Sequence, residues 1–369
     1  MTESAAAKSG TLSGPSPGAQ EGQAAVPVVR RRDPVPLGAG ICIAAVGSVV
    51  LAAMNGSYLG LTVTTGIGYA IVTVGMVLQL GYSRQLAFSQ SVFMGLGAYG
   101  VGVLETKYGF SSLESLLAVI GLAAVAALLI GAVVTRAPGL ALALATLLLP
   151  LFIYQLATYS NWLGSFSGIN GVLPLLTGPD YTATLVESGI ACAVLLGIAA
   201  AIVLRVIRSG VGLQLMAMAE DERLGESIGV SLRQRRLEVF VLGSVLAAVG
   251  GAVLVSAQGL VTPDVLSETA EITLLLMLFV AGRKSVVGAI LGAIVIEYLT
   301  TSTSFISTNI GIIEGIALLV ILLVEPDGVA GAVARLLGRR TDRWAESLRS
   351  WSAGRFRPGG GGNGARNAA

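Results

Sequence analysis

Long apolar stretches separated by short polar connections run along most of this chain, and this pattern predicts an all-α membrane protein that crosses the bilayer many times. The stretches are apolar on every side, whereas a helix of a soluble protein usually shows one apolar stripe. One transmembrane helix needs about 20 apolar residues. We predict about ten segments, and the eighth is short enough to be a half-span or part of a broken helix. The predicted segments are 38–54, 60–80, 86–104, 115–134, 139–158, 186–204, 239–257, 270–282, 285–302 and 309–324.

The composition agrees with a polytopic membrane protein. Hydrophobic residues make up 54% of the chain and charged residues 12%, and the mean hydropathy is +0.81. Ordinary soluble domains carry about 25% charged residues. Residues 1–36 are rich in Ala, Gly, Ser and Pro, and residues 331–369 are basic and Gly-rich. We therefore expect a transmembrane domain over 37–330 between two cytosolic tails, of which the first is disordered.

The distribution of basic residues predicts which connections lie in the cytosol, because Lys and Arg concentrate on that side of a membrane protein. With both termini inside, the inner connections carry Arg84, Arg136 and the arginines between 205 and 238. Lys107 is the only basic residue of the outer connections. Ten spans satisfy the rule at every connection, so we predict a multi-pass topology with both termini in the cytosol.

The segment 205–238, called the charged segment below, is the clearest functional feature of the sequence. It holds eleven charged side chains between two apolar stretches, so it must project into water. The chain has no phosphate-binding loop of the form G-x-x-x-x-G-K-[ST], since Gly-Lys does not occur as a dipeptide. The charged segment is therefore either a docking site for a soluble partner or a solvated loop that only follows the charge rule.

Uncharged polar residues and glycines gather around the second and third predicted segments. Each glycine in a helix interior costs roughly 0.5–1 kcal/mol relative to alanine. Two explanations remain open: close packing between helices, or a discontinuous helix that lines a polar pathway. The candidate residues of a translocation pathway are Gln85, Ser89, Gln90, Gly95, Gly97 and Tyr99.

Three acidic residues, Glu271, Glu297 and Glu314, fall in or near predicted segments. A charge inside the bilayer is costly and often functional, so a structural or interfacial role and a place on the pathway both stay open. The three are too scattered in sequence to indicate a catalytic pair. Because the chain has no histidine and only two cysteines, both inside apolar segments, we expect no catalytic site, no metal site and no bound cofactor.

Small residues spaced four apart predict close contacts between helices, because they let two backbones approach. Such spacing occurs in three of the later segments. The residues concerned are Gly243, Ala247 and Gly251, the pair Gly288 and Gly292, and the pair Gly311 and Gly315.

Four sequence motifs occur in the same order as in a known family. The first consists of residues 80–90 (LGYSRQLAFSQ) and 93–99 (FMGLGAY), which together look like the pattern LGYTGQLSLGHAAFFGIGAY. The other three, with looser matches, are residues 136–147, 168–172 and 209–230. In this order they resemble the M-type permease of ABC importers for branched-chain amino acids. Each stretch alone is weak, but the ordered set is specific and covers about residues 40–330.

The resemblance implies a permease subunit of an ABC importer for branched-chain or related small amino acids or amides, in a bacterial cytoplasmic membrane. Two separate cytosolic ATPase subunits would bind ATP. A homologous permease subunit, an extracytoplasmic solute-binding protein and membrane lipid would be the other partners, with no nucleic acid. The charged segment would carry the helix that couples to the ATPase. The coupling residues implied are Glu220, Asp221, Glu222, Leu224, Gly225, Glu226 and Gly229.

The chain departs from the family pattern at four places, one of which is Ala281-Gly282-Arg283-Lys284 in place of a Gly-rich turn. Arg84 stands where the pattern has a glycine, and Gln90 where the family often has a histidine. Leu224-Gly225 replaces a pair of alanines in the coupling helix. A changed substrate, a changed regulation and weakened coupling would each fit these differences.

The alternative function is a stand-alone secondary transporter or channel for a small polar solute. Such a protein would need an internal repeat and an ion-carrying acid near mid-membrane. We find no convincing repeat, so the importer subunit is the preferred hypothesis.

Overall fold

The computed structural model describes residues 57–85, 87–136, 139–220, 231–303 and 309–324. All of them belong to one compact unit of the chain, which spans 33–369. The first predicted segment, the two predicted tails and most of the predicted coupling residues lie outside the described residues. The coupling residues concerned are Asp221, Glu222, Leu224, Gly225, Glu226 and Gly229.

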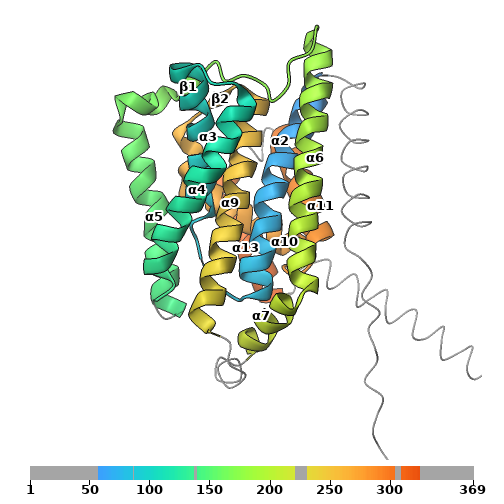
Figure 1. The fold of residues 1–369 in the computed structure, drawn as a ribbon. Helices are drawn as coiled ribbons and strands as arrows, with labels where there is room; N and C mark the ends of the chain where they lie inside the picture. The colour runs from blue at the N-terminus through green and yellow to red at the C-terminus, as the bar shows by residue number, and fades with distance from the viewer. Residues whose placement is uncertain (1–56, 86, 137–138, 221–230, 304–308, 325–369) are drawn as a thin grey trace, which may run out of the picture. The chain divides into compact units, whose positions relative to one another are not determined.

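The described part of the chain is almost entirely helical, which confirms the all-α fold (Figure 1). Nine of the ten predicted segments coincide with helices, and the tenth, 38–54, is the one outside the described residues. The helices are α2 (Ser57–Met76), which continues as the π-helix η1 (Val77–Tyr82), α3 (Gln90–Tyr108), α4 (Ser112–Val134), α5 (Gly139–Tyr159), α6 (Tyr181–Arg208), α7 (Gly210–Glu220), α9 (Leu232–Gln258), α10 (Glu268–Ala281), α11 (Val286–Ser302) and α13 (Ile310–Val324).

Length and hydropathy together separate the described helices into two groups. Five are long and apolar enough to cross a membrane, and they correspond to α2 with η1, α4, α5, α6 and α9. Helix α10 has 14 residues, which at 1.5 Å per residue gives about 21 Å against a hydrocarbon core of about 30 Å. The eighth predicted segment is therefore a short helix, as its sequence suggested.

Two predicted boundaries were wrong. Helix α3 begins at Gln90 and not at residue 86, because residues 83–85 and 87–89 are not helical. Helix α6 begins at Tyr181, five residues before the predicted start, and it ends at Arg208. The prediction followed hydropathy alone, so it extended α3 over the apolar residues before Gln90 and missed the more polar first turns of α6.

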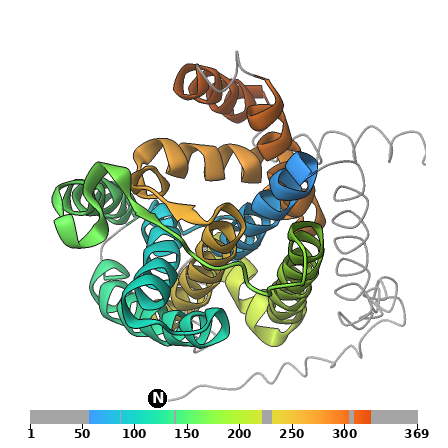
Figure 2. The same cartoon turned by 90° about the horizontal axis from the view of Figure 1, so that it is seen from above.

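The helices α2 and α9 form the centre of the described bundle, with α3, α4, α6, α10 and α11 around them (Figure 2). In each of the two central helices, 83% of an apolar stretch of 18 residues is buried, whereas in α4 the corresponding share is 22%. Glycines allow this approach: a Cβ atom on Gly75 would lie 3.0 Å from the carbonyl oxygen of Gly243, and one on Gly68 would lie 3.0 Å from that of Gly250. The close packing predicted for the Gly243 series is confirmed.

The pair Gly311 and Gly315 behaves differently from the Gly243 series. A Cβ atom added at either position would meet no atom within 4 Å among the described residues. The packing predicted for this pair was therefore wrong, at least within the described part of the chain. Helix α13 instead exposes large apolar side chains such as Ile312 and Leu323, which are 67% and 77% exposed.

The connections gather at two opposite ends of the bundle, in the grouping that the charge distribution predicts. At one end Arg84 donates a hydrogen bond to the carbonyl oxygen of Ala219 (3.1 Å). At the same end the hydroxyl of Tyr82 donates a hydrogen bond to the carbonyl oxygen of Lys284 (3.4 Å). At the other end the short strands β1 (Ile169–Asn170) and β2 (Leu260–Val261) pair in antiparallel register. Connections predicted to share a side thus lie together; which end faces the cytosol stays a prediction.

Candidate functional site

The chain between η1 and α3 enters the protein interior without forming a helix. Ala87 and Ser89 are fully buried, and Gln85 is 3% exposed. Backbone that is neither helix nor barrel strand is tolerated within a membrane only where protein buries it or where it lines a polar cavity. Helix α3 therefore begins inside the bundle, where its first carbonyl acceptor, that of Ser89, receives the amide of Phe93.

A group of buried polar side chains surrounds the start of α3, and we call Gln79, Gln85, Ser89, Gln90 and Glu271 the polar cluster. The amide of Gln90 donates to Oε1 of Gln79 (2.5 Å), and the amide of Gln79 donates to the carbonyl oxygen of Phe240 in α9 (3.1 Å). The backbone amide of Ser91 donates to Oε2 of Glu271 in α10 (2.7 Å). The cluster thus joins η1, α3, α9 and α10.

Several polar atoms of this cluster have no hydrogen-bond partner in the described part of the chain. They are both side-chain polar atoms of Gln85, Oγ of Ser89, Oε1 of Gln90 and Oε1 of Glu271. Buried polar groups in proteins are nearly always hydrogen-bonded, to protein or to water. So many unpartnered atoms at one place indicate a site that takes up water or a polar solute.

The structure brings together only half of the predicted pathway residues. Gln85, Ser89 and Gln90 belong to the polar cluster. Gly95 and Gly97 lie further along α3, where a Cβ atom would meet the side chain of Leu266 at 2.1 Å and the carbonyl oxygen of Ala248 at 1.9 Å. Neighbouring residues therefore pack closely against these two glycines, and a pathway role for them stays a prediction.

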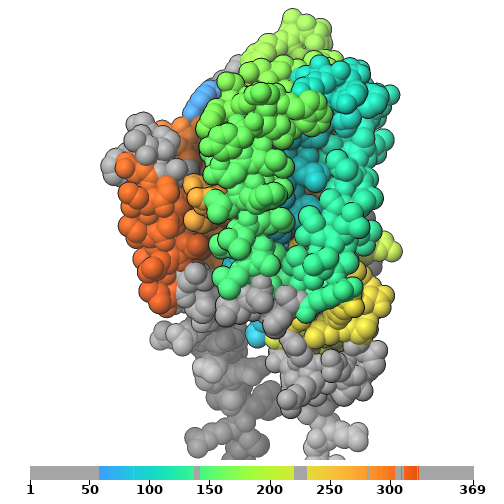
Figure 3. All heavy atoms as spheres, turned by 90° about the vertical axis from the view of Figure 1, so that its left-hand side faces the viewer, coloured from blue at the N-terminus to red at the C-terminus, as the bar shows by residue number. Residues whose placement is uncertain are grey.

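Tyr99 lies apart from the polar cluster. It lines an apolar groove of about 530 Å³ formed by α3, α4 and the 3₁₀ turn η2 (Asn161–Leu163). Figure 3 shows the face on which α4 and α5 lie next to each other with atoms of α3 visible between them. The lining is mostly aliphatic and aromatic, with polar atoms only on Tyr99, Tyr108 and Trp162, and it includes no residue of the polar cluster.

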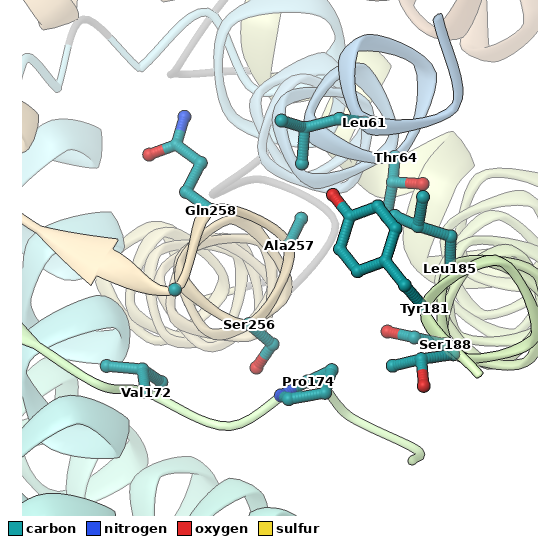
Figure 4. A pocket seen from close by; sticks show the side chains of 12 residues that line it. Leu61, Thr64, Val172, Pro174, Tyr181, Leu185, Ser188, Ser256, Ala257 and Gln258 are labelled. Atoms are coloured by element: carbon teal, nitrogen blue, oxygen red, sulfur yellow. The ribbon is translucent and has the colours of Figure 1, made fainter. Parts of the chain in front are cut away.

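A second cavity, of about 330 Å³, lies between α2, α6 and α9 near the end that carries β1 and β2. Thr64, Tyr181, Ser188, Ser256 and Gln258 give it polar side chains, and no charged residue lines it (Figure 4). The hydroxyl of Ser188 is buried and has no assigned hydrogen-bond partner among the described residues. This cavity suits a polar solute that carries no net charge.

Sequence reasoning missed this cavity. Tyr181, Thr184 and Ser188 recur at the spacing of one helix face, but the predicted sixth segment began only at residue 186. A signal for the earlier start was present, because Asp180 stands immediately before the first helical residue and Asp is a preferred residue there.

Glu297 and Glu314 lie in the later helices. Oε2 of Glu314 accepts a hydrogen bond from Thr273 of α10 (2.7 Å), and Oε1 of Glu297 accepts one from Thr301 (3.3 Å) within α11. Both carboxyl groups therefore have partners outside the polar cluster. Glu271 is the one of the three acids that reaches the candidate pathway residues.

The end that carries Arg84 also carries the described flanks of the charged segment. Helix α7 ends at Glu220, and the chain resumes in the described part at Ser231, just before α9. Arg84 bonds the carbonyl oxygen of Ala219, one residue before the end of α7, and its φ of 49° is a left-handed conformation that favours glycine. Glycine is the residue that the family pattern has at this position.

We expect replacement of Arg84 by glycine to weaken transport without unfolding the protein. Glycine removes a strain of about 1–2 kcal/mol and loses one exposed hydrogen bond of about 0.5–1.5 kcal/mol, so the free energy of unfolding should change little. In an ATP-driven importer of the kind that the sequence resembles, import should fall about fivefold, the equivalent of one such bond, because α7 is no longer tied to the η1 turn. Unchanged import by Arg84→Gly would contradict this role; Arg136→Gly, which removes an arginine elsewhere, is the control.

The fold and these sites define a multi-pass membrane protein with a polar interior site and a charged segment at one end, as a solute permease requires. The chain matches the family described as "Branched-chain amino acid transport system / permease component" over residues 58–324. It therefore belongs to this family of transport permeases.

Two curated relatives are similar to the chain. Each is named "High-affinity branched-chain amino acid transport system permease protein LivM"; the one from Escherichia coli (strain K12) is 26% identical over 253 residues, and the one from Salmonella typhimurium is 23% identical over 252. Each alignment covers 62% of this chain and 59% of the relative. The chain thus matches less than two thirds of their length, and no solved structure matches it.

Proposed function

We propose that the protein is the transmembrane permease subunit of an ABC importer for branched-chain or related small amino acids or amides, in a bacterial cytoplasmic membrane. The observation that carries this proposal is the family match, which covers nearly every described helix. The names of the two relatives supply the solute class. The uncharged polar cavity between α2, α6 and α9 fits a small solute with no net charge.

The polar cluster and this cavity belong to the proposed solute pathway. They lie at different depths, with the cavity near the β1–β2 end and the cluster nearer to the end that carries Arg84. A pathway of alternating access would open to each in turn. Neither contains a group of three or more Asp, Glu, Cys or His side chains that could hold a metal ion, among the described residues. As a separate point, we propose that ATP is bound only by partner subunits.

The charged segment is the proposed contact with one of the two cytosolic ATPase subunits. Its described flanks, α7 and the start of α9, lie at the same end as Arg84 and Lys284, which is the end predicted to be cytosolic. A homologous permease subunit and an extracytoplasmic binding protein complete the proposed assembly.

Deletion of residues 219–229 tests the proposal. We expect the variant to insert into the membrane but to lose co-purification of the ATPase subunits and all ATP-driven import, because the proposed contact residues are gone. A deletion of the same length within 355–369 is the control and should keep both. Normal recruitment of the ATPase by the 219–229 variant would show that the charged segment is not the coupling element.

Uptake by the reconstituted importer distinguishes the solute and the class of transporter. Proteoliposomes with the complete complex are supplied with labelled leucine, urea and short amides, with and without ATP. Import of leucine that requires ATP and the binding protein supports the proposal. Uptake by the permease alone, without ATPase subunits, would indicate a stand-alone transporter.

A further inference from the structure

Helix α3 has an unusual beginning, because a carboxylate from another helix takes the place of its N-cap. Ser89 stands at the N-cap position, yet its side chain makes no capping hydrogen bond. Instead Oε2 of Glu271 accepts the amide of Ser91 at 2.7 Å. Glu271 is 5% exposed and Ser89 is fully buried. The start of α3 and the carboxylate therefore meet inside the protein.

This contact places two opposite charges side by side. The first amides of a helix have no partner within the helix, and the N-terminus carries about +0.5 of an elementary charge. Glu271 supplies the negative charge when it is ionised. A site with both features is complementary to a zwitterion, whose anionic end suits the helix amides and whose cationic end suits the carboxylate. Half-helices that start within a membrane bind anionic solute groups in this way.

Three of the unpartnered atoms of the cluster are acceptors that suit the cationic end. Oε1 of Glu271, Oε1 of Gln90 and Oγ of Ser89 all accept hydrogen bonds, and all three lack a partner in the described part of the chain. An ammonium group has three N–H donors and no acceptor. Ser89 and Gln90 are the two residues before Ser91, whose amide Glu271 accepts, so all three side chains belong to the region where α3 begins.

We propose that the start of α3 and Glu271 bind the zwitterionic backbone of a free α-amino acid during transport. The ammonium group contacts Glu271, Gln90 and Ser89, and the carboxylate takes the α3 amides. In the structure described, Glu271 occupies the place of the solute carboxylate at the amide of Ser91. The inference rests on the proposed function and narrows it, because amides and other solutes without both charges would not fit.

The test uses the complete importer in proteoliposomes, with labelled leucine as the probe. Glu271→Gln keeps an acceptor for the Ser91 amide, so α3 stays capped, but it removes the negative charge. We expect the maximal rate of leucine import to fall at least about tenfold, as for a lost charged hydrogen bond. The KM for leucine should change little, since the binding protein captures the solute, and ATP hydrolysis stimulated by the binding protein should persist. Ser89→Ala should lower the maximal rate about threefold.

Matched controls separate solute binding from capping. Glu314→Gln changes another carboxyl group that is buried and has one unpartnered oxygen, and Ser115→Ala removes another buried, unpartnered hydroxyl. Both controls should import leucine within about twofold of the wild type.

The inference is wrong if Glu271→Gln imports as well as Glu314→Gln. If Glu271→Gln fails to assemble, Ser89→Ala decides: import equal to that of Ser115→Ala would leave Glu271 as a cap only. A wild-type importer that moves no amino acid would overturn the proposed function, and this inference with it.

Discussion

Gly97→Val is expected to lower the free energy of unfolding by at least about 3 kcal/mol, the upper range for overpacking a core. A Cβ atom at this position would lie 1.9 Å from the carbonyl oxygen of Ala248 and 2.6 Å from its carbon. Both atoms belong to the backbone of the central helix α9, so no side-chain rotation relieves the clash. Helices α3 and α9 must separate, and the packing between them is lost. Unfolding by denaturing detergent in mixed micelles measures the change.

Gly121→Val is the matched control for this variant. Gly121 also lies inside a long apolar helix, α4, but a Cβ atom there would meet nothing within 4 Å among the described residues. We expect this variant to unfold like the wild type. A Gly97→Val protein that is as stable as the control yet fails to import would point instead to the pathway role that the sequence left open.

The contrast between these glycines shows what the sequence could and could not predict. Nine apolar segments were long enough to be recognised as helices, because hydropathy over a dozen or more residues does not depend on tertiary contacts. The sequence of α3 could not decide whether its glycines pack or line a pathway. That choice depends on which backbone lies opposite, and Ala248 is far away in sequence.

The polar cluster was predicted only in part, for the same physical reason. Gln85, Ser89 and Gln90 stood out because they are polar residues close together between apolar stretches. Glu271 is separated from Ser91 by 180 positions, so its role at the start of α3 depends on how α10 packs. The charge distribution, in contrast, predicted which connections meet at each end, because it is a property of the whole chain.

Replacement of Gln79 by methionine is expected to cost about 2–3 kcal/mol of unfolding free energy. Gln79 and Gln90 are both fully buried and hydrogen-bonded to each other at 2.5 Å. Without Gln79, the amide of Gln90 loses its only assigned partner, and an unsatisfied buried polar group costs about 1–3 kcal/mol. Gln90→Met should have a similar effect, since it leaves Oε1 of Gln79 without a donor. Methionine has nearly the same length, so neither change leaves a large cavity.

The double variant Gln79→Met/Gln90→Met should be more stable than the sum of the two single variants predicts, by about 1–2 kcal/mol, because neither unsatisfied amide remains. Strict additivity would show that the two side chains do not interact.

The same double variant also distinguishes a role in stability from a role in transport. If the polar cluster belongs to the solute pathway, the double variant is folded, recruits the ATPase and still fails to import leucine, because apolar side chains now fill a site that must bind a polar solute. Full import by a folded double variant would instead limit Gln79 and Gln90 to holding η1, α3 and α9 together.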